Sequence, residues 1–211
     1  AVWNCARALH SKCDKLSSLG VDVAIVPECA EPDILRRKAP DFAFTDCEWT
    51  GENKDIGLGV FSFGKTTLRR HQSWDRSHHI FLRVEVRGAT SPNLLAVWAF
   101  NQRVPATVTP NPTTTRHALE HYAPFLTTSP SVVAGDFNSN VMWDEDGKYS
   151  SFAEVDRTLG SYGLVSAYHA HSGEALGKET RPTHFLQRNR DKTYHIDYVY
   201  IPRSWAERKP E

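Results

Sequence analysis

Short apolar runs that end in polar residues are the dominant pattern of the chain. Each run is rich in β-branched and aromatic residues and is bounded by Gly, Pro, Asn or Ser, which is typical of β-strands. We predict strands at residues 21–26, 42–49, 56–63, 79–87, 94–100, 132–135 and 193–201, and the end of another strand at residues 1–4. The sequence therefore favours a protein built mainly from sheets.

Helical spacing is restricted to a few segments. Apolar residues recur every three or four positions in residues 6–19 and 113–126, and a third helix is predicted at 151–159. Gly20 follows the first segment and suits the left-handed position that closes a helix. Because few helices are separated by several strands each, we predict an α+β class with sheet packed on sheet and helices on the outer faces.

Composition limits the class of protein further. A chain of 211 residues is long enough for one domain with a full core. Its 25 basic residues balance its 25 acidic residues, so any recognition of a polyanion must be local. The four cysteines, Cys5, Cys13, Cys29 and Cys47, show no C-x-x-C spacing, and neither a zinc site built from them nor a disulfide framework is predicted.

Localisation signals are weak. No apolar run approaches the roughly 20 residues that cross a bilayer, and no signal peptide is visible. The compartment stays open, with the cytoplasm favoured.

Polar residues with ligand chemistry stand at the ends of several predicted strands. They are Asn4, Glu28, Asp136, Asn138, and the pair His195 and Asp197. A single carboxylate at such a place usually makes a turn, but strand ends of one sheet edge converge in space. Carboxylate and amide oxygens without cysteine suit a hard cation, Mg²⁺ or Mn²⁺.

Two details sharpen this expectation. Asp136 follows directly on the apolar run VVAG, where an unpaired carboxylate would be costly to bury, so a metal, a water or an imidazole is expected opposite it. His195 and Asp197 are two residues apart in a predicted strand, and their side chains should share one face. A solvated polar face is the alternative interpretation of this pair.

Five short motifs, in their order along the chain, resemble the endonuclease/exonuclease/phosphatase superfamily, which includes DNase I and exonuclease III-like nucleases. They are AVWN (1–4), IVPE (25–28), AGDFNSN (134–140), RPTHF (181–185) and HIDYVYIP (195–202). The resemblance implies a four-layer α/β/β/α sandwich with two mainly antiparallel sheets flanked by helices. It also implies metal-assisted hydrolysis of a phosphoester by an activated water.

The resemblance implies a role for individual residues. The implied roles are metal binding for Glu28 and Asn4, activation of water for Asp136, phosphate binding for Asn138, orientation of a catalytic histidine for Asp197, and contacts near the metal or substrate phosphate for Thr183 and Asn101. His195 is the nearest candidate for the imidazole. Trp98 and Trp143 are candidate substrate contacts, although a core position is equally compatible with Trp98.

The chain departs from the superfamily pattern in three places. Ala6 stands where many nucleases carry an aspartate, and Trp98 stands where a His or Tyr is usual. The S-D-H-x-P motif that holds the superfamily's histidine does not occur before Glu211. We therefore expect a single domain over residues 1–211 that lacks its N-terminal residues and its C-terminal strand.

Local basic stretches bear on the choice between the candidate functions, although a solvated loop face is an equally open interpretation of them. Residues 65–76 and 181–192 could follow a phosphate backbone, with Trp74 or Phe185 available for stacking. The favoured function is a Mg²⁺-dependent phosphodiesterase that acts on DNA. A phosphatase or phospholipid phosphodiesterase on the same fold, and a non-catalytic binding module, are the alternatives.

Two further histidine clusters are interpreted as non-ligands. The pair His78 and His79, and the pair His169 and His171, each lack a third ligand at helical or finger spacing.

Overall fold

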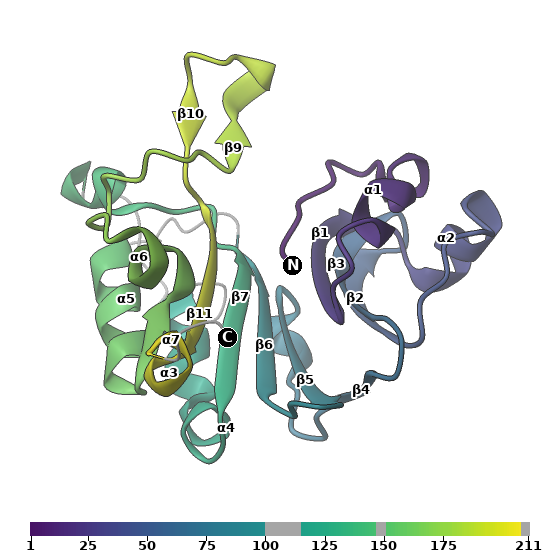
Figure 1. Cartoon of the computed structure of the whole chain (residues 1–211), viewed down its shortest axis with the longest axis horizontal. Coiled ribbons are helices and arrows are strands. Elements are labelled where there is room, and N and C mark those ends of the chain that lie inside the picture. Colours follow the sequence, from purple (N-terminus) through teal and green to yellow (C-terminus); the bar gives the residue numbers. More distant parts are fainter. Residues whose placement is uncertain (100–114, 147–150, 208–211) are drawn as a thin grey trace.

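The apolar runs of the sequence form two main β-sheets (Figure 1). The computed structural model describes residues 1–99, 115–146 and 151–207. The larger sheet has the strand order β4 (Thr67–Arg70), β5 (Phe81–Arg87), β6 (Asn93–Trp98), β7 (Ser131–Asp136), β11 (Asp197–Pro202), β8 (Leu164–Ser166). The smaller sheet has the order β1 (Val23–Cys29), β3 (Ile56–Ser62), β2 (Cys47–Asn53). A separate hairpin is made by β9 (His184–Phe185) and β10 (Thr193–Tyr194).

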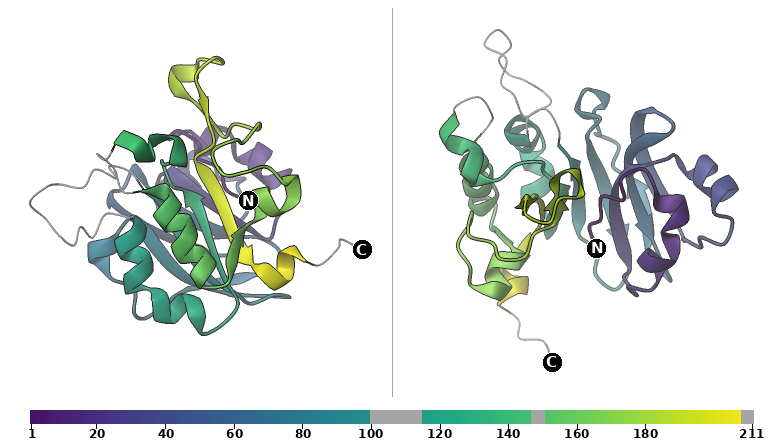
Figure 2. Two further views of the ribbon diagram at one scale, coloured as in Figure 1. Left: turned by 90° about the vertical axis from the view of Figure 1, so that its left-hand side faces the viewer. Right: turned by 90° about the horizontal axis from the view of Figure 1, so that it is seen from above.

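Helices cover the outer face of each sheet (Figure 2). The larger sheet carries α3 (Thr115–His121), α4 (Ala123–Thr127), α5 (Phe152–Ser161), α6 (Ala167–Ser172) and α7 (Arg203–Ala206). The smaller sheet carries α1 (Cys13–Ser17) and α2 (Pro32–Lys38). The 3₁₀ turns are η1 (Leu9–Ser11), η2 (Arg76–His78), η3 (Val141–Asp146) and η4 (Leu186–Arg188).

The core consists of three apolar clusters, and strand β1 contributes side chains to two of them. Ile25 packs between the two sheets, whereas Ala24 and Val26 pack toward the helices that cover the smaller sheet. Both faces of this strand are buried, so its sequence reads as a continuous apolar run. Complete burial of a side chain such as Leu82 between the sheets stabilises the fold by roughly 1.5–3 kcal/mol. The predicted α+β class with sheets flanked by helices is confirmed.

Strand pairing brings the ends of three strands to one edge of the larger sheet. β6 runs parallel to β7 and places Trp98 opposite Asp136, and β11 runs antiparallel to β7 and places Asp197 opposite Asp136. Gly135 precedes Asp136 with φ +150°, and a Cβ atom there would lie 1.9 Å from the carbonyl oxygen of Val97. Only glycine allows β6 and β7 to approach this closely just before the candidate carboxylate.

Several elements differ from the sequence prediction. The helix predicted at 6–19 begins later, because Ala6 and Arg7 have φ angles of 49° and 63°. The helix predicted at 113–126 is divided between α3 and α4, and Pro124, which has no N–H, stands in the first turn of α4. The strand predicted at 193–201 is interrupted, since His195 and Ile196 lie between β10 and β11.

Two further expectations concern the environment of the chain. Within the described parts of the chain, no helix has the length and apolarity needed to cross a bilayer. All four cysteines are free thiols, with Cys5 and Cys29 buried in the cluster beneath α1 and α2.

Candidate functional site

A pocket of about 620 Å³ lies where β1 and β7 end and β11 begins, beside the β9–β10 hairpin. Its wall includes Asn4, Glu28, Asp136, Thr183, His184 and Asp197. The structure thus brings together five of the residues predicted from the sequence, and Ala6 also faces this pocket.

Asn4 joins carboxylates that come from the two different sheets. Residues 1–4 run beside β1, with Val2 bridged to Ile25, and this places Asn4 near the end of that strand. Its Nδ2 donates to Oε1 of Glu28 at 3.1 Å and to Oδ2 of Asp136 at 2.9 Å. Its Oδ1 accepts from the backbone N–H of Ala6 at 3.0 Å, which fixes the orientation of the amide.

The backbone at two of the site residues is strained. Glu28 has φ 58° at the point where the pairing of β1 with β3 shifts register, and Asn138 has φ 45°. A left-handed non-glycine residue costs about 1–3 kcal/mol and persists where the surroundings hold it. The bulge in β1 re-aims the side chain of Glu28 toward the pocket. The N–H of Asn138 donates to Oδ1 of Asp136 at 2.9 Å, which holds that turn.

Negative charge is concentrated in this pocket. Burial raises the pKa of Asp136 to about 7, the charges of Asp197 and Glu28 act in the same direction, and the bonds from Asn4 and Asn138 oppose it. Burial also raises the pKa of Asp197 to about 6, against the effect of the Thr183 hydroxyl. Oδ1 of Asp197 is buried and has no hydrogen-bond partner among the residues that the structure describes.

The excess of negative charge in this pocket fits a divalent cation. Three carboxylates, one of them with an orphaned oxygen, offer the hard oxygen donors that Mg²⁺ and Mn²⁺ prefer. A bound cation would reverse the cost of burying adjacent negative charges.

Thr183 supports the site through its hydroxyl. Its Oγ1 accepts from the backbone N–H groups of Ile196 and Asp197, both at 3.1 Å. These bonds hold the chain where it enters β11 and so position Asp197.

A second pocket of about 460 Å³ adjoins the first, because Glu28 lines both. Asn138 and Trp98 lie in this second pocket, together with Arg7 and His79. Trp98 therefore lines this pocket and, half-buried, also packs against the core between the sheets.

His195 does not lie with the carboxylates. Its ring is buried, its Nδ1 is 2.8 Å from the carbonyl oxygen of Arg181, and it contacts the rings of Tyr168 and Tyr198. The face expected from its spacing to Asp197 is not observed, because the chain leaves the strand pairing between them. Imidazole chemistry in the pocket would need another histidine.

Two other predicted residues lie elsewhere. Trp143 packs on Tyr194 with ring centroids 5.1 Å apart and lines neither of these two pockets. Asn101 lies outside the described residues.

Sequence reasoning missed His184, which lies in the wall of the first pocket beside Thr183. The basic stretch 181–192 contributes Arg188 and Arg190 to the same wall. His184 belongs to the RPTHF motif, so the signal was present. The position of His184 in the pocket depends on the β9–β10 hairpin, which rises above the end of the larger sheet (Figure 1) and was not predicted from the sequence.

Comparisons with known proteins establish the fold. No family model and no curated protein sequence matches the chain. An AP endonuclease from Archaeoglobus fulgidus is similar in structure, with a TM-score of 0.66 and 13% identity over 100% of this chain and 87% of that one. The 3′ phosphatase NExo from Neisseria, bound to a product DNA hairpin, has a TM-score of 0.65 and 16% identity over 100% of this chain and 88% of that one. D. rerio TDP2 in complex with a single-strand DNA product has a TM-score of 0.56 and 13% identity over 99% of this chain and 84% of that one.

Proposed function

Because the chain has the fold of endonuclease/exonuclease/phosphatase proteins, we propose that it is a divalent-metal-dependent phosphodiesterase that hydrolyses DNA. The observation that carries this proposal is the meeting of Glu28, Asp136 and Asp197 in one pocket, with the first two held by the amide of Asn4. A pure binding module has no need for three carboxylates gathered in one pocket, with Asp136 buried among them.

Glu28 is the residue assigned to the cation, with Mg²⁺ favoured and Mn²⁺ as the alternative, whereas Asn4, whose Nδ2 donor faces the carboxylates, is assigned to hold Glu28 and Asp136 beside it. The side chain of Glu28 is re-aimed into the pocket by the bulge in β1, and the Asn4 amide holds it there. When bound, the cation would stabilise the charge that develops on the phosphate and leaving oxygens.

Asp136 is assigned to the attacking water. Its carboxylate is fixed by donors from Asn4 and from the backbone of Asn138, so its lone pairs keep one direction. A carboxylate held in this way can orient a water and take its proton as the water attacks phosphorus. The amide of Asn138, on the side of Trp98, is assigned to a non-bridging phosphate oxygen.

His184 is assigned the imidazole role that the sequence suggested for His195. It lines the pocket together with Asp136 and Asp197, and it belongs to strand β9.

 In this role a ring N–H of His184 would donate to a phosphate or leaving oxygen bound in the pocket. Arg188 and Arg190, further along the same hairpin, supply positive charge for the DNA backbone.

DNA is the favoured substrate because the hairpin adds local positive charge to a chain with no net charge. Trp98 offers an aromatic face in the adjoining pocket on which a base could stack. A phosphate monoester or a phospholipid on the same fold is the alternative.

A substrate panel tests the proposal. Supercoiled plasmid, a duplex with an abasic site, a 3′-phosphate oligonucleotide and a water-soluble phospholipid would each be incubated with the protein in Mg²⁺ or in EDTA. We expect Mg²⁺-dependent cleavage of the plasmid or of the abasic duplex, the two DNA phosphodiester substrates, and no hydrolysis of the phospholipid. Hydrolysis of the 3′-phosphate alone or of the phospholipid alone would select the alternative, and hydrolysis of none of the four would contradict the proposal.

A further inference from the structure

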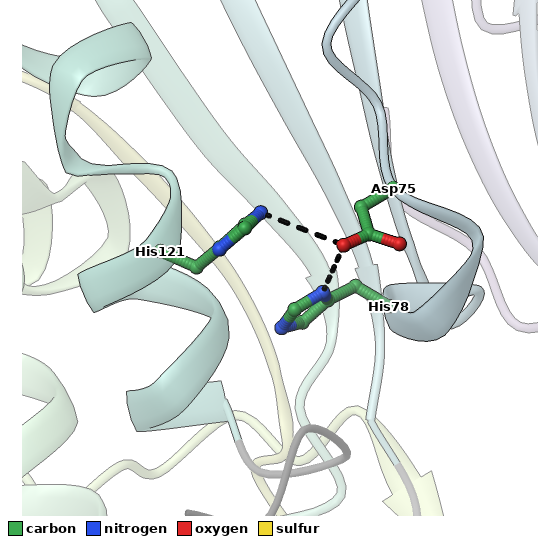
Figure 3. A group of neighbouring side chains, drawn as sticks. All are labelled: Asp75, His78 and His121. Carbon is green, nitrogen blue, oxygen red and sulfur yellow. Dashed lines mark ion pairs between the residues drawn. The ribbon is translucent and has the colours of Figure 1, made fainter.

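A second group of ligand-type side chains lies outside both pockets, where η2 meets helix α3 (Figure 3). Asp75 and His78 belong to η2 and its cap, and His121 is the last residue of α3. No third ligand stands near the pair His78 and His79 in the sequence, but folding brings His121 to His78 across 43 positions of the chain.

The three ligand atoms are almost close enough to bind one ion. Oδ2 of Asp75 lies 3.9 Å from Nδ1 of His78 and 3.9 Å from Nε2 of His121. All three potential ligand atoms lie within 4.8 Å of one another. Tetrahedral ligands at zinc–ligand distances of about 2.1 Å are roughly 3.4 Å apart, so small side-chain rotations would complete the site.

Neighbouring groups already orient two of the ligands. Oδ1 of Asp75 accepts from the N–H of Ser77 at 2.8 Å, and this turns Oδ2 toward the two imidazoles. Nε2 of His78 lies 3.3 Å from Nδ1 of His117, so Nδ1 of His78 is the nitrogen that faces Asp75. A ligating histidine commonly has its other ring nitrogen held in this way. The hydroxyl of Ser77, 3.1 Å from Nδ1 of His78, would give way to the ion.

The donor set and its exposure select the kind of ion. Two imidazole nitrogens and one carboxylate oxygen suit Zn²⁺ better than the all-oxygen preference of Mg²⁺. The side chain of His78 is 3% exposed, whereas those of Asp75 and His121 are 45% and 41% exposed. One buried anchor and two accessible ligands leave a route for the ion and room for a water as fourth ligand.

We propose that Asp75, His78 and His121 form a Zn²⁺ site that fastens η2 to the end of α3. The next residue along the chain, His79, lines the pocket that also contains Glu28 and Asn138. Zinc bound at His78 would therefore hold this wall of the candidate active site in place. The role is structural and does not depend on the proposed hydrolysis.

Zinc binding to the whole protein, freed of any histidine tag, tests this proposal. The affinity and stoichiometry would be measured by competition with a chromophoric zinc chelator, in excess Mg²⁺. Asp75→Asn and His121→Gln change exposed side chains, and each should weaken zinc binding at least about tenfold. His171→Gln, an exposed histidine outside the cluster, and Glu28→Gln should bind zinc like the unmodified protein.

Thermal melting and Co²⁺ spectra supply readouts that do not depend on activity. Zinc at about a hundredfold excess over its Kd should raise the Tm by roughly 5–10 °C, and much less in Asp75→Asn. Co²⁺ should give visible absorption without the charge-transfer band of a cysteine thiolate. The proposal is overturned if zinc does not bind, if Asp75→Asn and His121→Gln leave the affinity unchanged, or if Glu28→Gln alone abolishes binding.

Discussion

At the scale of single residues, the candidate site holds negative charge that the metal-free protein can stabilise only in part. Asn4 supplies one NH₂ group to two carboxylates, and Oδ1 of Asp197 is without a partner within the described parts of the chain. Glu28 and Asn138 add backbone strain at the same place. These features lower stability where the proposed chemistry needs them, so single substitutions should separate stability from activity.

Replacing Asp197 with Asn should stabilise the metal-free protein at alkaline pH. The folded pKa of about 6 exceeds the ordinary value of 3.8, so the ionised carboxylate costs stability above pH 6 and this cost disappears as the pH falls toward 4. The difference corresponds to at most roughly 3 kcal/mol. In EDTA, Asp197→Asn should therefore melt higher than the unmodified protein at pH 8, with a smaller gap at pH 5.

The matched control is Asp41→Asn, which changes an exposed carboxylate and should leave the Tm unaltered at both pH values. A lower Tm for Asp197→Asn than for the unmodified protein at pH 8 would contradict this account of the buried charge.

Two histidines should respond differently to substitution. His184→Gln should lower kcat on DNA by about 10²–10⁴-fold with little change in Tm, because His184 lines the pocket and is assigned the imidazole role there. His195→Gln should lower the Tm and change kcat much less, because that ring is buried against Tyr168 and Tyr198. Paired kinetic and melting measurements check this, and the reverse pattern would restore His195 as the functional imidazole.

At the scale of elements, the site depends on how strands end. The ends of β1 and β7 were predictable from apolar runs followed by polar residues, and the structure brings Glu28 and Asp136 together as expected. The position of His195 was not predictable, because two-residue spacing fixes a shared face only in an uninterrupted strand. The chain is interrupted between Tyr194 and Asp197, and that break depends on contacts with distant residues such as Thr183.

The close approach of β6 and β7 makes Gly135 sensitive to substitution. Gly135→Ala would place a Cβ atom against the backbone of Val97, which cannot move without breaking the pairing that positions Asp136. We expect a loss of roughly 3 kcal/mol or more, or failure to fold.

Gly160→Ala is the matched control, since this glycine lies in α5 with no atom within 4 Å of an added Cβ. It should raise stability by about 0.5–1 kcal/mol because alanine favours the helix. Chemical denaturation should show a lower free energy of unfolding for Gly135→Ala and a higher one for Gly160→Ala. Equal stabilities of the two variants would contradict the contact assigned to Gly135.

At the scale of the whole molecule, the candidate site forms only when both sheets are assembled. Asn4 and Glu28 come from the smaller sheet and its edge, whereas Asp136 and Asp197 come from the larger one. The motif order along the sequence was sufficient to predict this fold and the meeting of these four residues in one pocket, whereas their roles stay predictions. The group of Asp75, His78 and His121 could not be predicted, because helix α3 meets η2 only in the folded chain and no local spacing records that contact.

The most direct test of the central claim is the rate of DNA cleavage by the unmodified protein, Asp136→Asn and Asp41→Asn, each in Mg²⁺ and in EDTA. The account predicts Mg²⁺-dependent cleavage by the unmodified protein and by Asp41→Asn, and a loss of about 10²–10⁴-fold in Asp136→Asn. Circular dichroism would confirm that each variant is folded. Cleavage by folded Asp136→Asn at the unmodified rate, or cleavage that persists in EDTA, would contradict the assignment of this pocket as the active site.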